Sequence, residues 1–495
     1  MDSQRATRLT SLAVRGLAIA ALLAVPLTLV ARFHYLPFDD CLWHAAKAVS
    51  GRGWDEILVL RPEVTLDRHP GWHALLSAAH WALGGDAALL AVLSYLALFL
   101  LATLAPIPAL RRPEAWLGAL LVAAAASPEN LMHRLTRGRP YLVSMAALLL
   151  VLPLWDEQRW RKRSTWVASA LLVAASVWIH GSWYLWVIPA AALALAGRFR
   201  RAAAFSACAA AGALLGACLT GHPLRYLYEQ AQHAALSLGQ GNLTRMLVGE
   251  FQPYSDFFEV LVALALVLFA RRLVTGAWRT RDAEGYLLAL AGIGWVCGMQ
   301  VYRFWGEWGL PAVLLWTAYA LEDILEHLVQ EGSRRRLLFA AGLSVALWSA
   351  TTADFNGRYS GGLSAAPAGL SAAGESAFAS PAPARDARGW LPEPGGVVYS
   401  SNMDVFVWLF YEHPRGPWRY AYGYEAGLMT AANLEVLRGI QRDYGAWEAW
   451  QPWLEAMKPQ DRLVVVAAKQ PPLDQLEWAR WSHGMWIGRR PAPAP

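Results

Sequence analysis

The sequence has 495 residues, of which 56% are hydrophobic and only 16% are charged. Soluble domains carry about 25% charged residues, so this composition excludes an ordinary soluble enzyme and predicts a chain that crosses a membrane many times. The net charge is +6, but the basic residues form short clusters between apolar segments, a pattern that indicates membrane orientation and not a nucleic-acid partner. Only four of the 43 basic residues are lysine, a bias typical of bacteria with GC-rich genomes.

The first apolar segment, Leu12 to Val30, is long enough to cross a bilayer, which takes about 20 residues. Arg5, Arg8 and Arg15 lie at its N-terminal end, so the positive-inside rule places the N-terminus in the cytoplasm. No clear signal-peptidase site follows the segment. We therefore expect it to remain as a membrane anchor.

The loop that follows, residues 33–85, contains the most informative motif of the chain. Asp39 and Asp40 form an acidic pair close to the predicted outer membrane face. A carboxylate there could act as a general base, or the pair could hold a divalent cation such as Mg²⁺ or Mn²⁺. Acidic residues also favour helix N-termini, so the alternative is that the pair caps a helix predicted over Cys41–Val49.

The end of the same loop combines charge and imidazole ahead of a second helix. Asp67, Arg68 and His69 precede Pro70, and the apolar stretch over 70–84 predicts an amphipathic helix on the outer membrane interface. Asp67 and His69 are site candidates, with helix capping as the alternative interpretation.

Ten further apolar segments follow, and together with the first they predict eleven transmembrane helices over residues 1–355. We expect them at residues 86–108, 114–127, 139–155, 164–180, 183–197, 201–220, 256–270, 284–301, 307–326 and 336–352. The predicted fold class is therefore an all-α polytopic membrane protein.

Two kinds of connecting segment alternate along these spans. One kind is basic, and the other contains histidine, glutamate, asparagine and aromatic residues. With eleven spans, every basic segment lies in the cytoplasm, as the positive-inside rule requires. An odd number of spans then places the C-terminal region outside the cytoplasm.

Two of the outer segments contribute a carboxylate and an imidazole. Glu129 follows Ser127 and Pro128, where it is either a second catalytic acid or part of the first turn of a helix. His180 lies at an outer span end, where an ionisable residue suggests a functional role, although an interfacial histidine is inexpensive to place.

Two arginines lie next to predicted spans on the outer side, where a guanidinium could bind an anionic group. Arg303 interrupts an apolar stretch between two spans, and Arg139 opens another span. One alternative is an internal ion pair between Arg303 and Glu307, four residues further along a helix. Arg134 and Arg137 are alternatives of the same kind as Arg139, and these three could instead bind anionic lipid headgroups.

The composition changes after the last span. Residues 356–389 are rich in Gly, Ala, Ser and Pro and predict a linker, whereas residues 390–495 predict a small α/β domain outside the membrane. Apolar runs predict buried strands at 396–400 and 462–467, and the segment 424–457 predicts helices.

The helical segment of this domain carries three tryptophans, Trp447, Trp450 and Trp453. Tryptophan rings stack on sugars, so the domain could bind a glycan. The interpretation we favour is that these rings pack the core of the domain or lie on the membrane interface.

The arrangement resembles the GT-C superfamily of integral-membrane glycosyltransferases, such as the protein O-mannosyltransferases and the lipid A aminoarabinose transferases. The resemblance rests on four short motifs in the order expected for such enzymes. They are Phe38-Asp39-Asp40, Asp67-Arg68-His69-Pro70-Gly71-Trp72, Gly138-Arg139-Pro140 and Tyr302-Arg303-Phe304 ahead of Pro311. Two departures are Pro-Gly in place of Pro-Pro and the absence of an acid beside Gly138-Arg139.

This resemblance implies transfer of a sugar from a polyprenyl-phosphate donor in the bacterial inner membrane to a glycan, lipid or protein outside the cytoplasm. It implies catalytic roles for Asp39, Asp40 and Glu129 and phosphate binding by Arg303 and Arg139. Two other functions compete with it: a flippase or transporter for polyprenyl-linked glycans, and an O-antigen polymerase or ligase. Neither paired halves nor a large loop between late spans is evident in the sequence.

The topology can be tested with reporter fusions. A fusion after Lys162 should report the cytoplasm and a fusion after Asn356 the periplasm, because the basic segments stay inside. The opposite result at either position would contradict the eleven-span topology.

Overall fold

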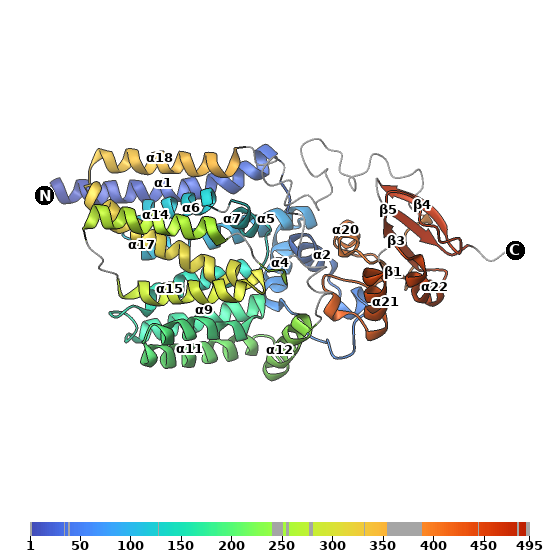
Figure 1. The fold of residues 1–495 in the computed structure, drawn as a ribbon. Coiled ribbons are helices and arrows are strands. Elements are labelled where there is room, and N and C mark those ends of the chain that lie inside the picture. The colour runs from blue at the N-terminus through green and yellow to red at the C-terminus, as the bar shows by residue number, and fades with distance from the viewer. Residues whose placement is uncertain are drawn as a thin grey trace. The chain divides into compact units, whose positions relative to one another are not determined.

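A computed structural model of the chain (Figure 1) shows a mostly helical protein that ends in a small β-sheet. It describes residues 2–33, 35–37, 40–126, 128–239, 251–253, 257–276, 281–330, 332–353, 389–443, 445–482 and 485–491. The chain forms two compact units. The helical unit contains Met1–Arg32, Tyr95–Leu227 and Val248–Leu363, and the loop–sheet unit contains Phe33–Ser94, Tyr228–Leu247 and Ser364–Pro495.

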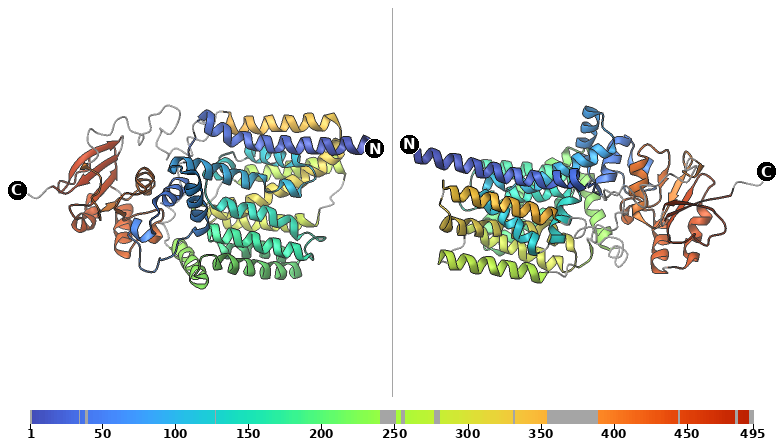
Figure 2. Two further views of the ribbon diagram at one scale, coloured as in Figure 1. Left: turned by 180° about the vertical axis from the view of Figure 1, so that it is seen from behind. Right: turned by 90° about the horizontal axis from the view of Figure 1, so that it is seen from above.

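The helical unit consists of helices, most of which run side by side (Figure 2). They are α1 (Asp2–Phe33), α5 (Ala87–Leu104), α6 (Pro113–Ala126), α7 (Pro128–Thr136), α8 (Tyr141–Val151), α9 (Arg163–His180), α10 (Val187–Leu195), α11 (Phe199–Cys218), α12 (Pro223–Gly239), α14 (Phe257–Thr275), α15 (Asp282–Gly298), α16 (Tyr302–Phe304), α17 (Leu310–Leu328) and α18 (Arg334–Thr352). Two of these elements, α5 and α12, extend into the loop–sheet unit.

Small residues allow two of these helices to pack closely. A side chain at Gly212 or Gly216 of α11 would collide with the backbone oxygens of Ala170 and Ala174 in α9. Close approach of helix backbones at small residues is common in membrane proteins, where water does not drive association.

Three described helical segments are long and apolar enough to cross a membrane: Thr7–Phe33, Ala87–Ala109 and Phe199–Cys218. Shorter apolar helical segments cover Pro113–Ala126, Tyr141–Trp155 and Trp183–Leu195. The three membrane-length segments are fewer than the eleven predicted spans. Charged residues explain why two of the predicted spans are not among them. Helix α14 carries one acidic and two basic residues, and α17 carries three acidic residues in its second half.

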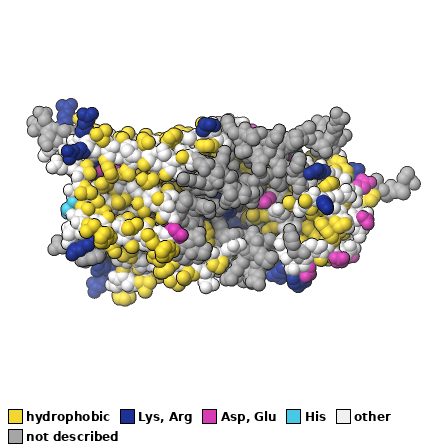
Figure 3. Space-filling view, turned by 45° about the horizontal axis from the view of Figure 1, so that its top comes forward, with side chains coloured by type: hydrophobic (Ala, Val, Ile, Leu, Met, Phe, Trp, Pro, Cys, Tyr) yellow, Lys and Arg dark blue, Asp and Glu magenta, His cyan; other side chains and the backbone are white. Residues whose placement is uncertain are grey.

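The surface of the helical unit also combines apolar and charged regions. Hydrophobic side chains cover much of its visible face in Figure 3, and basic side chains gather at one end. Exposed apolar residues lie on several helices, including Leu12, Leu171, Phe199, Leu266 and Phe269.

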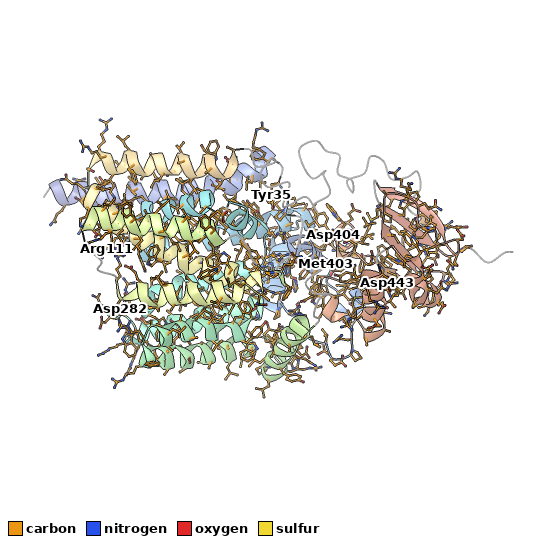
Figure 4. All side chains as sticks on the ribbon, viewed as in Figure 1. Tyr35, Arg111, Asp282, Met403, Asp404 and Asp443 are labelled. Atoms are coloured by element: carbon orange, nitrogen blue, oxygen red, sulfur yellow. The ribbon has the colours of Figure 1, made fainter. Side chains whose placement is uncertain are left out.

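The basic segments of the sequence meet acidic residues at this end of the helical unit, where Figure 4 labels Arg111 and Asp282. Arg336 of α18 donates to both carboxylate oxygens of Glu114 in α6, at 2.6 and 3.1 Å. Both side chains are almost fully buried, at 1% and 0% exposure. Further pairs join Arg281 to Glu322 and Arg271 to Glu284.

Removal of one member of the Glu114–Arg336 pair should strongly destabilise the helical unit, because it leaves a buried charge without compensation. We expect Glu114→Gln to lower the free energy of unfolding by about 3–5 kcal/mol. The matched control is Arg111→Ala, which removes an exposed pair with Glu326 and should cost about 1 kcal/mol or less. Melting temperatures of the full chain in detergent would measure both, and equal shifts would contradict this account.

The loop–sheet unit contains a five-stranded sheet of order β2-β1-β3-β5-β4. The strands are β1 (Val397–Tyr399), β2 (Arg419–Tyr420), β3 (Arg462–Val466), β4 (Glu477–Ser482) and β5 (Met485–Arg489). Strand β1 is parallel to β2 and β3, and β5 is antiparallel to β3 and β4. Strands β1 and β3 confirm the predicted strands, whereas β2, β4 and β5 were not predicted.

Helices α20 (Met403–Glu412), α21 (Ala431–Arg442) and α22 (Gln451–Ala456) complete this part of the unit. Trp450 and Trp453 are buried in its core with Leu437 and Leu463, and Trp447 packs against them. The tryptophans therefore serve the core of the domain, as the favoured interpretation predicted.

The segment after the first helix belongs to the same unit. It forms α2 (Asp40–Ser50), α3 (Trp54–Ile57) and α4 (Pro70–Leu83), which include the predicted helices at 41–49 and 70–84. Beyond α3, the backbone N–H groups of Val59 and Arg61 donate to the carbonyl oxygens of Tyr420 and Leu428, at 2.9 and 3.1 Å. These hydrogen bonds extend the edge of the sheet with a segment that lies about 360 residues earlier in the chain.

Candidate functional site

A carboxylate and two imidazoles form a continuous hydrogen-bonded chain in the loop–sheet unit. Asp67 Oδ2 lies 2.5 Å from His73 Nδ1, and His73 Nε2 lies 2.7 Å from His44 Nδ1. Helix α4 supplies His73 and helix α2 supplies His44, and these two helices pack together. We call this set, Asp67, His73 and His44, the acid–imidazole chain.

Local backbone structure fixes the position of Asp67. Its Oδ1 accepts a hydrogen bond of 3.0 Å from the backbone N–H of His69, the residue that precedes α4. Pro70 occupies the first position of the helix, where its fixed φ and missing N–H are tolerated. Asp67 therefore fixes the turn before α4 and at the same time contacts His73. It does not cap the helix, as the alternative interpretation had it, because the N-cap residue of α4 is His69.

Burial sets the electrostatics of the chain. His44 is fully buried, the His73 side chain is 7% exposed and the Asp67 side chain is 24% exposed. Burial alone would raise the pKa of Asp67, but the charge and hydrogen bond of His73, together with the backbone N–H of His69, hold that pKa well below its usual range. The carboxylate is consequently ionised at neutral pH.

Aromatic rings enclose this chain. The ring of Trp43 stacks on Tyr424 with 4.3 Å between centroids, and Trp54 lies 4.9 Å from Tyr424. Burial raises the pKa of the Tyr424 hydroxyl far above its usual range. The His69 ring is 5.0 Å from that of His44, so it belongs to the same cluster.

Of the acidic pair Asp39 and Asp40, only Asp40 lies among the described residues. Asp40 is the first residue of α2, and its Oδ1 accepts a 3.0 Å hydrogen bond from Trp43 Nε1. Asp39 lies outside the described residues, so the predicted roles of the pair as base or cation ligand stay predictions. Within the residues that the structure describes, no group of three or more His, Cys, Asp or Glu side chains could hold a metal ion.

A second charged cluster holds the first loop against helix α12 and the C-terminal residues. Glu425 pairs with Arg68 and lies 2.8 Å from His233 Nε2. Glu229 accepts hydrogen bonds from the Thr65 hydroxyl and backbone N–H, at 2.7 and 3.3 Å. These contacts fix the segment that carries Asp67.

An open cavity of about 550 Å³ lies beside the acid–imidazole chain, with Asp67 in its wall. The segment from Gly53 to Asp67 supplies most of the lining, and Lys47, Arg419 and Tyr424 supply the rest. A hydroxyl in this cavity could therefore donate a hydrogen bond to an ionised carboxylate.

The helical unit brings other predicted residues together. Arg303 donates through Nε to Glu307 at 2.5 Å, and its Nη2 lies 2.9 Å from His180 Nε2. His180 Nδ1 lies 3.3 Å from the Ser144 hydroxyl. The internal ion pair considered for Arg303 is thus present. Arg303 also contacts His180, and the sequence did not predict this contact.

A turn of π-helix, Trp305–Gly309, follows Arg303, and such turns are frequent at functional sites. Arg134 is buried between the rings of Tyr141 and Tyr302, at 5.1 and 4.5 Å. A side chain at Gly306 would collide with the Arg134 guanidinium, so the guanidinium would have to move.

Two further candidate residues lie at, or just before, the start of a helix. Arg139 is buried just ahead of α8. Glu129 lies in the first turn of α7, as the helix-start alternative predicted, and its side chain is outside the description.

Comparison with known proteins adds no identification. The sequence matches no protein-family model and has no significant similarity to a curated protein.

The lowered pKa of Asp67 predicts a specific dependence of stability on pH. An acid whose folded pKa is below its unfolded value of about 4 stabilises the fold above that pH, and this contribution is lost as the pH falls. We expect the difference in melting temperature between wild type and Asp67→Asn to be constant from pH 6 to 5 and to shrink below about pH 4. Asp474→Asn, at an exposed carboxylate, serves as the control. A difference that persists undiminished to pH 3 would exclude the proposed ion pair.

Proposed function

We propose that the protein is an integral-membrane glycosyltransferase of the GT-C kind, which transfers a sugar from a polyprenyl-phosphate donor to an acceptor outside the cytoplasm. The observation that carries this proposal is the acid–imidazole chain beside an open cavity, on the loop that follows the first membrane-length helix. A catalytic carboxylate on the first outer loop is what the GT-C resemblance implies.

The proposal includes the eleven-span topology in the bacterial inner membrane, with the C-terminal domain in the periplasm. The three membrane-length helices and the exposed apolar side chains of the helical unit support it. Basic residues at one end of that unit also support a cytoplasmic orientation for this end.

The chemistry requires a base for the acceptor and cations for the leaving phosphate. The acceptor oxygen attacks the anomeric carbon, the bond between this carbon and the phosphate oxygen breaks, and polyprenyl phosphate leaves with the bonding electrons. In this scheme Asp67 accepts the proton of the acceptor hydroxyl, which becomes acidic as its oxygen bonds to the anomeric carbon, and His73 and His44 fix the orientation of the carboxylate. The GT-C resemblance implies that Arg303 and Arg139 bind the leaving phosphate, since a guanidinium can donate two parallel hydrogen bonds to phosphate oxygens.

This scheme gives Asp67 the role that the sequence first suggested for Asp39 and Asp40. Asp67 lies in the wall of the cavity and is anchored by two hydrogen bonds. Asp40 instead accepts a hydrogen bond from Trp43, which supports the stack on Tyr424.

Donor consumption tests the proposal directly. Purified full chain in nanodiscs is supplied with a panel of polyprenyl-phosphate sugars and a periplasmic glycan extract, and formation of polyprenyl phosphate is followed by mass spectrometry. We expect at least one donor to be consumed. Asp67→Asn and His73→Gln should lower the rate about 100-fold or more, because general-base catalysis contributes about 10²- to 10⁴-fold.

The matched control is His80→Gln in the same helix, whose ring contacts the backbone oxygen of Gly85. It should retain near wild-type turnover. Failure of folded wild type to consume any donor, or equal rates for His73→Gln and His80→Gln, would overturn the proposal.

A further inference from the structure

The cavity beside the acid–imidazole chain has features of a ligand site. The proposed chemistry uses only Asp67 of its wall and assigns no role to the other lining residues. Its volume of about 550 Å³ lies within the range of about 300–1,000 Å³ typical of small-molecule sites. It opens to solvent, and its wall combines aromatic rings with charged side chains of both signs.

Three cations line this cavity, and none forms an ion pair with a carboxylate in the described part of the chain. Lys47 donates to the backbone oxygen of Arg52 at 2.5 Å, and Arg61 donates through Nε to that of Met429 at 3.1 Å. Arg419 of β2 is exposed, and its guanidinium makes no hydrogen bond to any residue that the structure describes. Backbone carbonyls therefore position two of the cations but do not neutralise them.

The acidic residues of the wall do not balance this charge. The wall has two carboxylates, Asp67 and Asp55, against the three cations. Burial lowers the pKa of Lys47, but the nearby charges of Asp67, Glu56 and Asp55 oppose that effect. The wall therefore has an excess of positive charge, which favours an anionic ligand.

The aromatic part of the wall indicates what carries the anion. Trp54 is nine-tenths buried, and part of its side chain lines the cavity. Tyr424 lines the same cavity. Aromatic rings contact the C–H faces of sugars, so the parts of Trp54 and Tyr424 that line the cavity indicate a carbohydrate.

We infer that this cavity binds an acidic carbohydrate, one that carries a carboxylate or a phosphate, with the anion held by Arg419, Lys47 and Arg61 and the sugar ring against Trp54 and Tyr424. The inference rests on the proposed function, in which this carbohydrate is the acceptor. The ligand would then present a hydroxyl to Asp67 in the same wall.

Equilibrium binding to the full chain in nanodiscs, without donor lipid, tests the inference. Trigalacturonate is compared with maltotriose, and glucose 6-phosphate with glucose, by saturation-transfer-difference NMR and thermophoresis. We expect at least one acidic probe to bind ten-fold or more tightly than its neutral counterpart. Preference for trigalacturonate assigns a carboxylate, preference for glucose 6-phosphate assigns a phosphate, and preference for both shows that the site reads charge alone.

Arg419→Ala should weaken binding of the acidic probe about ten-fold and leave the melting temperature unchanged, because this side chain is exposed. Arg480→Ala, at an exposed arginine of β4 outside the cavity wall, should have no effect. Equal binding of acidic and neutral probes, no binding of any probe, or equal effects of the two variants would overturn the inference. Since no donor lipid is present, such a failure would leave donor consumption, and so the proposed function, to be judged by its own assay.

Discussion

A charge removed from water must be compensated nearby, and this constraint governs both units of the protein. In the helical unit, Glu114 and Arg336 meet almost without solvent exposure and join α6 to α18. In the loop–sheet unit, Asp67 is compensated by His73, which in turn contacts His44. A buried ion pair is a weak source of net stability, but it strongly disfavours any arrangement that separates its members. Such pairs therefore fix which helices are neighbours.

The parts of the fold that the sequence predicted are those set by local pattern. Apolar runs gave β1 and β3, and the Pro70 signal gave the start of α4, because hydrophobic periodicity and helix-start residues act over a few positions. Strand β2 has only two residues, and β4 mixes tryptophan with charged residues, so neither carries a clear strand pattern. The addition of the first loop to the edge of the sheet joins residues about 360 positions apart and leaves no local signal.

The residues of the candidate site also differ in whether a local sequence pattern could predict them. Asp67 and His69 were singled out because they precede a helix, and the spacing of Arg303 and Glu307 indicated their ion pair. His44 and His73 were missed, because their contact depends on how α2 packs against α4. The four-residue spacing of His69 and His73 at the start of α4 was a signal that could have drawn attention to His73. Glu425 and His233 were also missed, since they meet only through tertiary structure.

The proposed glycosyltransferase must bind a phosphate-linked polyprenyl lipid. The most direct test is the melting temperature of wild type in detergent with added polyprenyl phosphate, compared with polyprenol of the same chain length. A ligand that binds only the folded state raises the melting temperature in proportion to the logarithm of its concentration above Kd. We predict a rise that depends on concentration with polyprenyl phosphate and little or none with polyprenol. Equal shifts with the two lipids, or no shift with either, would contradict the account.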